Sequence, residues 1–115
     1  MKQTVVFDFD GVIHSYTSGW QGPTIIPDPP VPGIKEAIAA IRAAGYEVVV
    51  VSTRTADIRG HGAVTAWLMD NEIEVDRVCA AKPPAIVYID DRAICFDGNP
   101  DTLLGKIQAF KPWNK

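Results

Sequence analysis

Cysteine is scarce in this sequence: Cys79 and Cys95 are the only two among 115 residues. Each follows apolar, strand-like residues, and no histidine lies near either of them in the sequence. We therefore expect small buried hydrophobic side chains rather than a disulfide framework or a thiol nucleophile. The scarcity argues against a secreted, disulfide-rich protein and favours a cytoplasmic location.

Long apolar runs and a strong excess of charge are also missing. No run approaches the roughly 20 residues that cross a bilayer, and Asp8 and Asp10 interrupt the N-terminal apolar stretch, unlike in a signal peptide. We expect no membrane partner. A formal net charge of −3 argues against stable nucleic-acid binding, because dedicated binders are usually basic. It leaves room for a small phosphorylated substrate, or a phosphorylated nucleic-acid end, held by a few local cations.

What the chain does contain is typical of one globular domain spanning residues 1–115. Hydrophobic residues make up 47% and charged residues 22%, and the length allows one core. Apolar strand-like runs alternate with helical patterns, and Val48 to Val51 is apolar on both faces, as in a parallel sheet covered on each side. This order predicts a three-layer, Rossmann-like α/β domain with a mainly parallel sheet. Strands are expected at 4–7, 46–51, 75–79, 85–89 and 93–96, and helices at 33–44, 63–71 and around Leu103, Leu104, Ile107 and Phe110.

Glycine and proline are concentrated in residues 13–32, which predicts a long irregular loop. Loops of this length in small domains are usually functional. The aromatic residues Tyr16 and Trp20 lie in it, and they either stack on a base or sugar or fasten the loop to the core. His14 follows the acid pair closely enough to be a candidate for substrate contact.

The acid pair Asp8 and Asp10 directly follows the first apolar strand. Side chains two residues apart in a strand point to the same side, so the two carboxyl groups start out as neighbours. Such neighbours repel and raise each other's pKa unless a cation lies between them. The pair predicts a divalent metal site with a reactive carboxylate beside it.

Polar residues also end the later strands. The second strand ends at Ser52-Thr53-Arg54 and the fourth at Asp90-Asp91-Arg92, while Lys82 lies in the loop before the fourth. Ligands of open parallel sheets bind beyond the carboxyl ends of the strands, so we expect these groups to converge. The set suits phosphoryl transfer, in which a carboxylate attacks phosphorus, Mg²⁺ neutralises charge, and a hydroxyl and an ammonium bind the phosphate oxygens. A second acid would move the proton.

With these motifs in this order, the chain resembles the haloacid dehalogenase-like (HAD) hydrolase superfamily. The resemblance covers about residues 4–96 and rests on four motifs: Asp8-Phe9-Asp10-Gly11-Val12, Val48-Val49-Val50-Val51-Ser52, Lys82, and Ile89-Asp90-Asp91. The segments between Asp10 and Ser52, and between Ser52 and Lys82, hold no room for a separate cap domain. The resemblance therefore implies a capless member with an open site, which receives large substrates or gains a cover by oligomerising.

The resemblance also implies roles for individual residues. Asp8 would be the nucleophile and a metal ligand, and Asp10 the general acid and base, with its backbone carbonyl on the metal. Ser52 and Lys82 would hold the phosphate, with Thr53 as the competing hydroxyl, although Ser52 could instead simply cap the following segment. The remaining metal ligands would be Asp90 and Asp91, of which we expect Asp91 to be the closer. Arg54 is either a substrate contact or a structural residue.

The expectation is therefore a magnesium-dependent phosphatase that acts through an aspartyl-phosphate on Asp8. The leaving group stays open between a nucleotide, a sugar phosphate and a nucleic-acid end. A receiver module of the bacterial response-regulator type would need an acceptor aspartate after the third strand, where Cys79-Ala80-Ala81 stands. A catalytically silent HAD-like binding or scaffold protein remains the open alternative, because intact motifs do not prove turnover.

Overall fold

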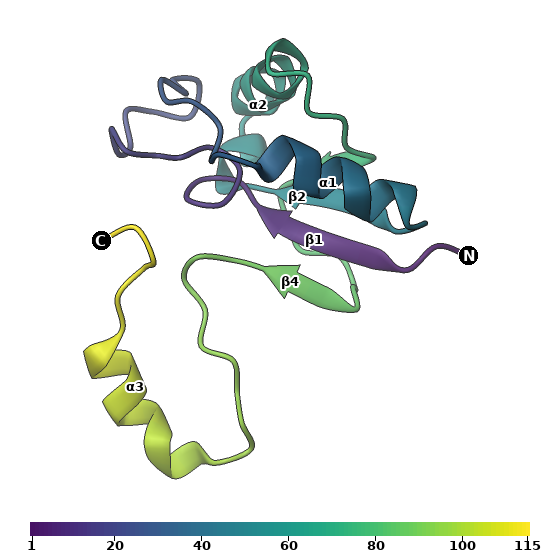
Figure 1. Cartoon of the computed structure of the whole chain (residues 1–115). Coiled ribbons are helices and arrows are strands. Elements are labelled where there is room, and N and C mark those ends of the chain that lie inside the picture. The colour runs from purple at the N-terminus through teal and green to yellow at the C-terminus, as the bar shows by residue number, and fades with distance from the viewer.

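A four-stranded, all-parallel sheet forms the centre of the computed structural model, which describes residues 1–115 (Figure 1). The strand order is β3-β2-β1-β4, and β1 pairs with both β2 and β4. The parallel α/β architecture expected from the sequence is confirmed. The strands are β1 (Thr4–Asp8), β2 (Glu47–Val51), β3 (Arg77–Cys79) and β4 (Val87–Ile89); the helices are α1 (Ile34–Ala43), α2 (Ile58–Asp70) and α3 (Leu103–Ala109), with 3₁₀ turns η1 (Thr53–Ala56) and η2 (Pro100–Thr102).

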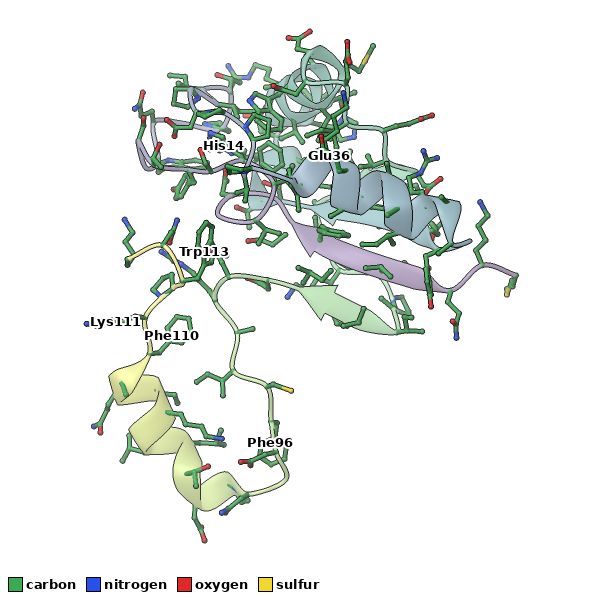
Figure 2. The ribbon with its side chains drawn as sticks, in the orientation of Figure 1. His14, Glu36, Phe96, Phe110, Lys111 and Trp113 are labelled. Carbon is green, nitrogen blue, oxygen red and sulfur yellow. The ribbon has the colours of Figure 1, made fainter.

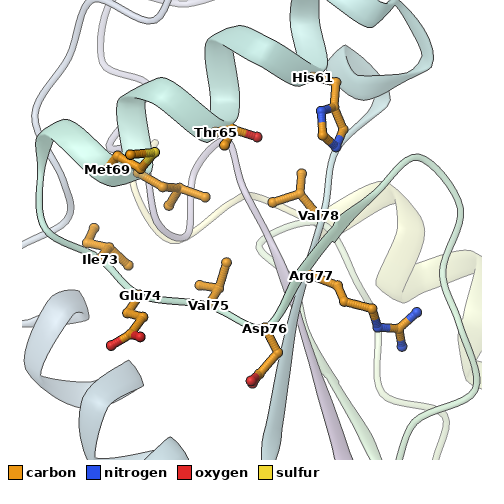
Figure 3. Close-up of a pocket in the computed structure, with 10 residues that line it drawn as sticks. His61, Thr65, Met69, Ile73, Glu74, Val75, Asp76, Arg77 and Val78 are labelled. Atoms are coloured by element: carbon orange, nitrogen blue, oxygen red, sulfur yellow. The ribbon is translucent and has the colours of Figure 1, made fainter.

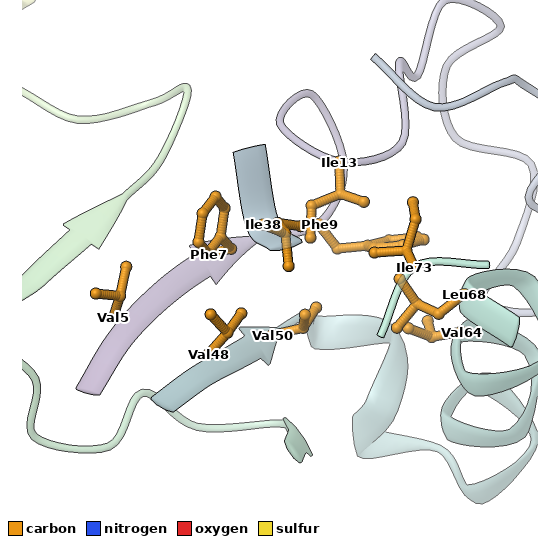
Figure 4. Close-up of a cluster of buried hydrophobic side chains, with 10 residues drawn as sticks. All are labelled: Val5, Phe7, Phe9, Ile13, Ile38, Val48, Val50, Val64, Leu68 and Ile73. Atoms are coloured by element: carbon orange, nitrogen blue, oxygen red, sulfur yellow. The ribbon is translucent and has the colours of Figure 1, made fainter. Parts of the chain in front are cut away.

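One face of the sheet is covered by α1 and α2 and holds the main core (Figure 4). The parallel register places Val5 beside Val48 and Phe7 beside Val50. Because strand side chains alternate, these four point to one face, where the helices bury them. The helices contribute Ile38 from α1 and Val64 and Leu68 from α2.

The opposite face is buried without a helix. Val6, Val49 and Val51 are buried there, and Ala85 packs against them. The chain between β3 and β4 supplies this cover, because these strands occupy opposite edges of the sheet and their connection must cross it. Helix α3 follows η2 directly and lies away from the sheet, so the second helical layer expected from the sequence is not formed (Figure 1).

Helix α2 begins at Ile58, five residues before the position expected from the apolar pattern. The Asp57 side chain accepts a hydrogen bond from the backbone N–H of Arg59 and so caps this end. Gly60 weakens the helical pattern in the sequence, yet the packing requires it. A Cβ at this position would lie 1.9 Å from the carbonyl oxygen of Arg54.

The C-terminal quarter departs most from the expectations. No strand forms at residues 93–96, because the chain leaves the sheet after β4. As a result, Phe96 is exposed (Figure 2). An apolar pattern alone does not supply the neighbouring edge that a strand needs. Cys95 is exposed and Cys79 half-buried, so the expectation of two buried thiols fails for Cys95. No helix is both long and apolar enough to span a bilayer.

Candidate active site

Three carboxyl groups meet at the carboxyl ends of β1 and β4. Asp8 is the last residue of β1, and Asp90 and Asp91 directly follow β4. The two strands are parallel neighbours, so their ends lie side by side. One carboxylate oxygen from each of the three residues lies within 4.8 Å of the other two. The structure thus brings together three of the four acids that the sequence assigned to a metal.

The crowding of acids changes the proton affinity of Asp8. Burial, a hydrogen bond with Asp91 and the charges of Asp90 and Asp91 raise the pKa of Asp8 to about 8. Such a group is deprotonated at neutral pH only when a cation offsets the charge. Hard divalent cations such as Mg²⁺ prefer carboxylate oxygens, so the donor chemistry of this cluster fits such an ion.

Gly11 is what allows Asp91 to approach the first strand. Its backbone has φ +86°, a left-handed conformation that side chains disfavour. A Cβ at Gly11 would lie 2.1 Å from Oδ2 of Asp91. The glycine of the first motif therefore makes space for the acid of the last one.

Asp10 lies outside the cluster and has different partners. Arg54 donates from Nε to Oδ2 at 2.9 Å and from Nη2 to Oδ1 at 3.2 Å. His14 Nδ1 lies 2.8 Å from Oδ1. Burial by itself would raise the pKa of Asp10, but the hydrogen bonds from His14 and Arg54 outweigh it and the net pKa is lowered. The side chain of Asp10 is thus held as a carboxylate beside the three acids.

The side chains of His14 and Arg54 are both buried, which favours the structural alternative for Arg54 and argues against the substrate contact expected for His14. The backbone N–H of Asp28 donates to Nε2 of His14 at 3.1 Å, so the ring carries its proton on Nδ1 and donates it to Asp10. Neither residue can reach a substrate in this conformation. Both contact Asp10 instead, which the sequence did not indicate because their orientation depends on the fold of the loop.

A hollow of about 330 Å³ opens beside the acids. Ser52, buried at its wall, caps η1: its Oγ accepts a hydrogen bond from the backbone N–H of Arg54 at 3.2 Å. The capping alternative therefore holds, and the hydroxyl proton is still available for donation to a ligand. The wall consists of Asp8, Asp10, Tyr16, Trp20, Ser52, Thr53, Asp90, Asp91 and Arg92.

Lys82 is placed at the edge of the acid cluster rather than in the wall of the hollow. Its Nζ lies 3.3 Å from Oδ2 of Asp90 and 5.5 Å from the ring centre of Tyr88. Burial would raise the pKa of Asp90, but the backbone N–H of Arg92 and the Lys82 ammonium lower it overall. The ammonium in this position neutralises one acid of the cluster.

Two residues at the site were not among the predicted site residues. Arg92 lines the hollow directly after the acid pair. Trp113, near the C-terminus, donates from Nε1 to the carbonyl oxygen of Gly11 at 2.8 Å, so the C-terminal segment returns to the first motif (Figure 2). A contact over such a sequence separation leaves no local pattern by which it could be predicted.

A second hollow of about 330 Å³ lies between α2 and β3 (Figure 3). It contains Asp76, but that carboxylate already accepts hydrogen bonds from Arg42 and from the backbone N–H of Val48. No cluster of convergent acids lies in this hollow. The chemistry therefore concentrates at the ends of β1 and β4.

The sequence matches no protein-family model and no curated protein. Among the solved structures that share the fold are chains from two structures of one complex. One is a chain from a structure of the Pnkp1/Rnl/Hen1 complex, with a TM-score of 0.56 and 17% identity over 94% of this chain and 36% of that chain. The other is a chain from a structure of the Pnkp1/Rnl/Hen1 RNA repair complex, with a TM-score of 0.54 and 16% identity over 92% of this chain and 30% of that chain. At this identity the likeness shows a shared fold, and our chain spans about a third of each of those chains.

Proposed function

We propose that this protein is a magnesium-dependent phosphomonoesterase that acts through an aspartyl-phosphate on Asp8. One observation carries the proposal: Asp8, Asp90 and Asp91 meet within 4.8 Å, and the same hollow contains Ser52 and Asp10. A metal-binding carboxylate, a carboxylate that can move a proton and a hydroxyl donor are the groups that phosphoryl transfer needs.

The chain's own residues supply the two chemical steps. In the first, the negative charge of the bound phosphate favours protonation of Asp10 from solvent. An oxygen of Asp8 then attacks phosphorus, the bond from phosphorus to the ester oxygen breaks, and Asp10 gives its proton to the leaving oxygen. In the second, Asp10 takes a proton from water, whose oxygen displaces the phosphoryl group from Asp8. The Ser52 hydroxyl donates to a phosphate oxygen where charge builds up. A bound Mg²⁺ would be held by Asp8, Asp90 and Asp91 and would offset the charge of the phosphate and the acids.

The substrate that we favour is a nucleotide, free or at a nucleic-acid end. Trp20 lines the hollow and is 54% exposed, so its indole offers a flat surface on which a base can stack. A nucleic-acid end also agrees with the shared fold of chains from an RNA repair complex. The local cations Lys82 and Arg92 would favour the phosphate despite the net charge of −3.

The experiment is a phosphate-release assay over nucleoside 3′- and 5′-monophosphates, 3′- and 5′-phosphorylated oligonucleotides, and sugar phosphates, with Mg²⁺ or EDTA. We expect magnesium-dependent release that is lost in Asp8→Asn and kept in Asp70→Asn, an exposed position on α2. Full activity of Asp8→Asn would contradict the proposal. No turnover on any ester, together with no binding of Mg²⁺ by calorimetry, would favour the catalytically silent binding protein.

A further inference from the structure

The Arg54 side chain makes its hydrogen bonds inside the protein, although the preceding residues Ser52 and Thr53 line the hollow. Its side chain is 0% exposed. Two of its nitrogens, Nε and Nη2, bind the two oxygens of Asp10. The third, Nη1, donates to the carbonyl oxygens of Gly22, Pro23 and Ile25 at 2.8, 3.2 and 3.2 Å. Every guanidinium nitrogen has an acceptor within the chain, and the side chain has no exposed surface at which a phosphate could bind.

The Trp20 ring covers the guanidinium from the side of the hollow. Its centre lies 4.6 Å from Cζ of Arg54. Because Trp20 is half-exposed and Arg54 is not, the indole lies between the cation and solvent. Exclusion of water strengthens the ion pair between Arg54 and Asp10 and makes its geometry harder to disturb.

The orientation of the Asp10 carboxyl group depends on two residues. Oδ1 accepts from His14 and from Nη2 of Arg54, while Oδ2 accepts from Nε of Arg54. Rotation of this carboxyl group would break all three hydrogen bonds. The group is 20% exposed, so a part of it still reaches the hollow.

Arg54 also joins the two walls of the hollow. Its backbone N–H donates to Oγ of Ser52, and its side chain holds the loop at residues 22–25, next to Trp20. A separate pair of hydrogen bonds from Ser18 to Asp28 closes the loop at its base. Through Arg54, the orientation of Asp10 and the position of the loop depend on the same side chain.

We propose that Arg54 is a positioning residue with two effects. It fixes the Asp10 carboxyl group for proton transfer, and it holds in place the loop of residues 18–28, which carries Trp20. The inference rests on the proposed function, in which Asp10 gives a proton to the leaving oxygen. Arg54 itself does not touch the substrate. Its effect must therefore depend on how much the leaving group needs that proton.

This dependence separates a positioning role from a merely structural one. In an alkyl phosphate such as a sugar phosphate, which has no base to stack on Trp20, the leaving group is an alkoxide that departs poorly and needs protonation. In p-nitrophenyl phosphate the leaving group is a stable anion and needs little. The ratio kcat/KM reports the step in which this group departs. Loss of proton transfer at Asp10 lowers kcat/KM for the alkyl ester by roughly 10²-fold or more, and for the aryl ester by less than about 10-fold.

The experiment measures kcat/KM on both esters for the parent protein, Arg54→Lys, Asp10→Asn and the double variant. Arg54→Gln is the second replacement, used if Arg54→Lys melts early. Arg59→Lys, an exposed arginine on α2, is the matched control. We expect Arg54→Lys to lose activity mainly on the alkyl ester, Asp10→Asn to show the same selectivity, and the double variant to be no worse than Asp10→Asn. Equal losses on both esters, or additive losses in the double variant, would overturn the inference.

Hydrogen–deuterium exchange tests the role of Arg54 in the loop independently of the proposed function. Without Arg54, the amides of residues 18–28 should exchange at least about 10-fold faster than in the parent protein and in Arg59→Lys. Unchanged exchange would overturn the holding of the loop. If the parent protein turns over neither ester, the proposed function fails and the catalytic part of the inference with it, whatever the exchange shows.

Discussion

The crowding of Asp8 against two other acids predicts how the metal-free protein responds to pH. The pKa of Asp8 is raised from 3.8 to about 8, by burial first and then by Asp91 and Asp90. In the unfolded chain the same group has its ordinary pKa. The folded state therefore binds this proton more tightly, and the stabilisation is present at low pH and lost as the pH rises from about 4 to about 8.

The size of the effect follows from the shift and from the exposure of the side chain. A difference of about four pKa units corresponds to about 5 kcal/mol. Asp8 is only half-buried, so solvent screening reduces the contribution, and we expect about 2 kcal/mol. For a domain of this length that corresponds to a change in Tm of roughly 8 °C. Asp8→Asn cannot ionise and lacks this contribution.

The assay is thermal unfolding followed by circular dichroism, in EDTA, at about pH 5 and about pH 9. We expect the metal-free parent protein to lose about 2 kcal/mol more than Asp8→Asn over this range, while Asp70→Asn behaves as the parent. Added Mg²⁺ should stabilise the parent protein most at the higher pH, because binding of the ion removes the proton. Identical pH dependence in the parent and Asp8→Asn would show that Asp8 does not bind this proton more tightly in the folded state.

Three further predictions follow from single side chains. In Gly60→Ala the new Cβ meets the Arg54 carbonyl oxygen, so urea unfolding should show a free energy of unfolding lower by about 2 kcal/mol or more. In Gly62→Ala, in the same helix, the new Cβ meets nothing within 4 Å, and the free energy of unfolding should rise by up to about 1 kcal/mol. Gly11→Ala should abolish calorimetric Mg²⁺ binding because it displaces Asp91, and Gly19→Ala, which also has positive φ but open space, should bind normally. Trp20→Ala should raise KM for a nucleotide about 10-fold and leave KM for a sugar phosphate unchanged. Trp20→Phe keeps an aromatic ring and should bring KM for the nucleotide back close to the parent value. Equal changes on both esters would refute a stacking role.

Much of the sheet is visible in the sequence because its apolar runs are local. The run ending at Asp8 and the run Val48 to Val51 each mark a strand and its carboxyl end. Since parallel strands align those ends, the meeting of Asp8 with Asp90 and Asp91 follows from the topology. These features needed only local patterns and one general rule of parallel sheets.

The rest depends on contacts that local patterns do not encode. The roles of His14 and Arg54 depend on where the loop of residues 13–32 folds, and glycine and proline punctuation does not fix that path. The early start of α2 depends on a cap at Asp57 and on close packing at Gly60. Similarly, the apolar pattern of residues 93–110 predicts amphipathic elements, while their position away from the sheet depends on the whole chain.

The proposed mechanism requires a covalent phosphoryl group on Asp8. A hydrolysable ester is mixed with the protein in Mg²⁺, the reaction is quenched, and borohydride is added to reduce any acyl phosphate to an alcohol. Peptide mass spectrometry then locates homoserine in place of aspartate. We expect homoserine at position 8, dependent on substrate and on Mg²⁺, and none at Asp10, Asp90 or Asp91. Phosphate release from the ester with no reduction at Asp8, or with reduction at another aspartate, would contradict it.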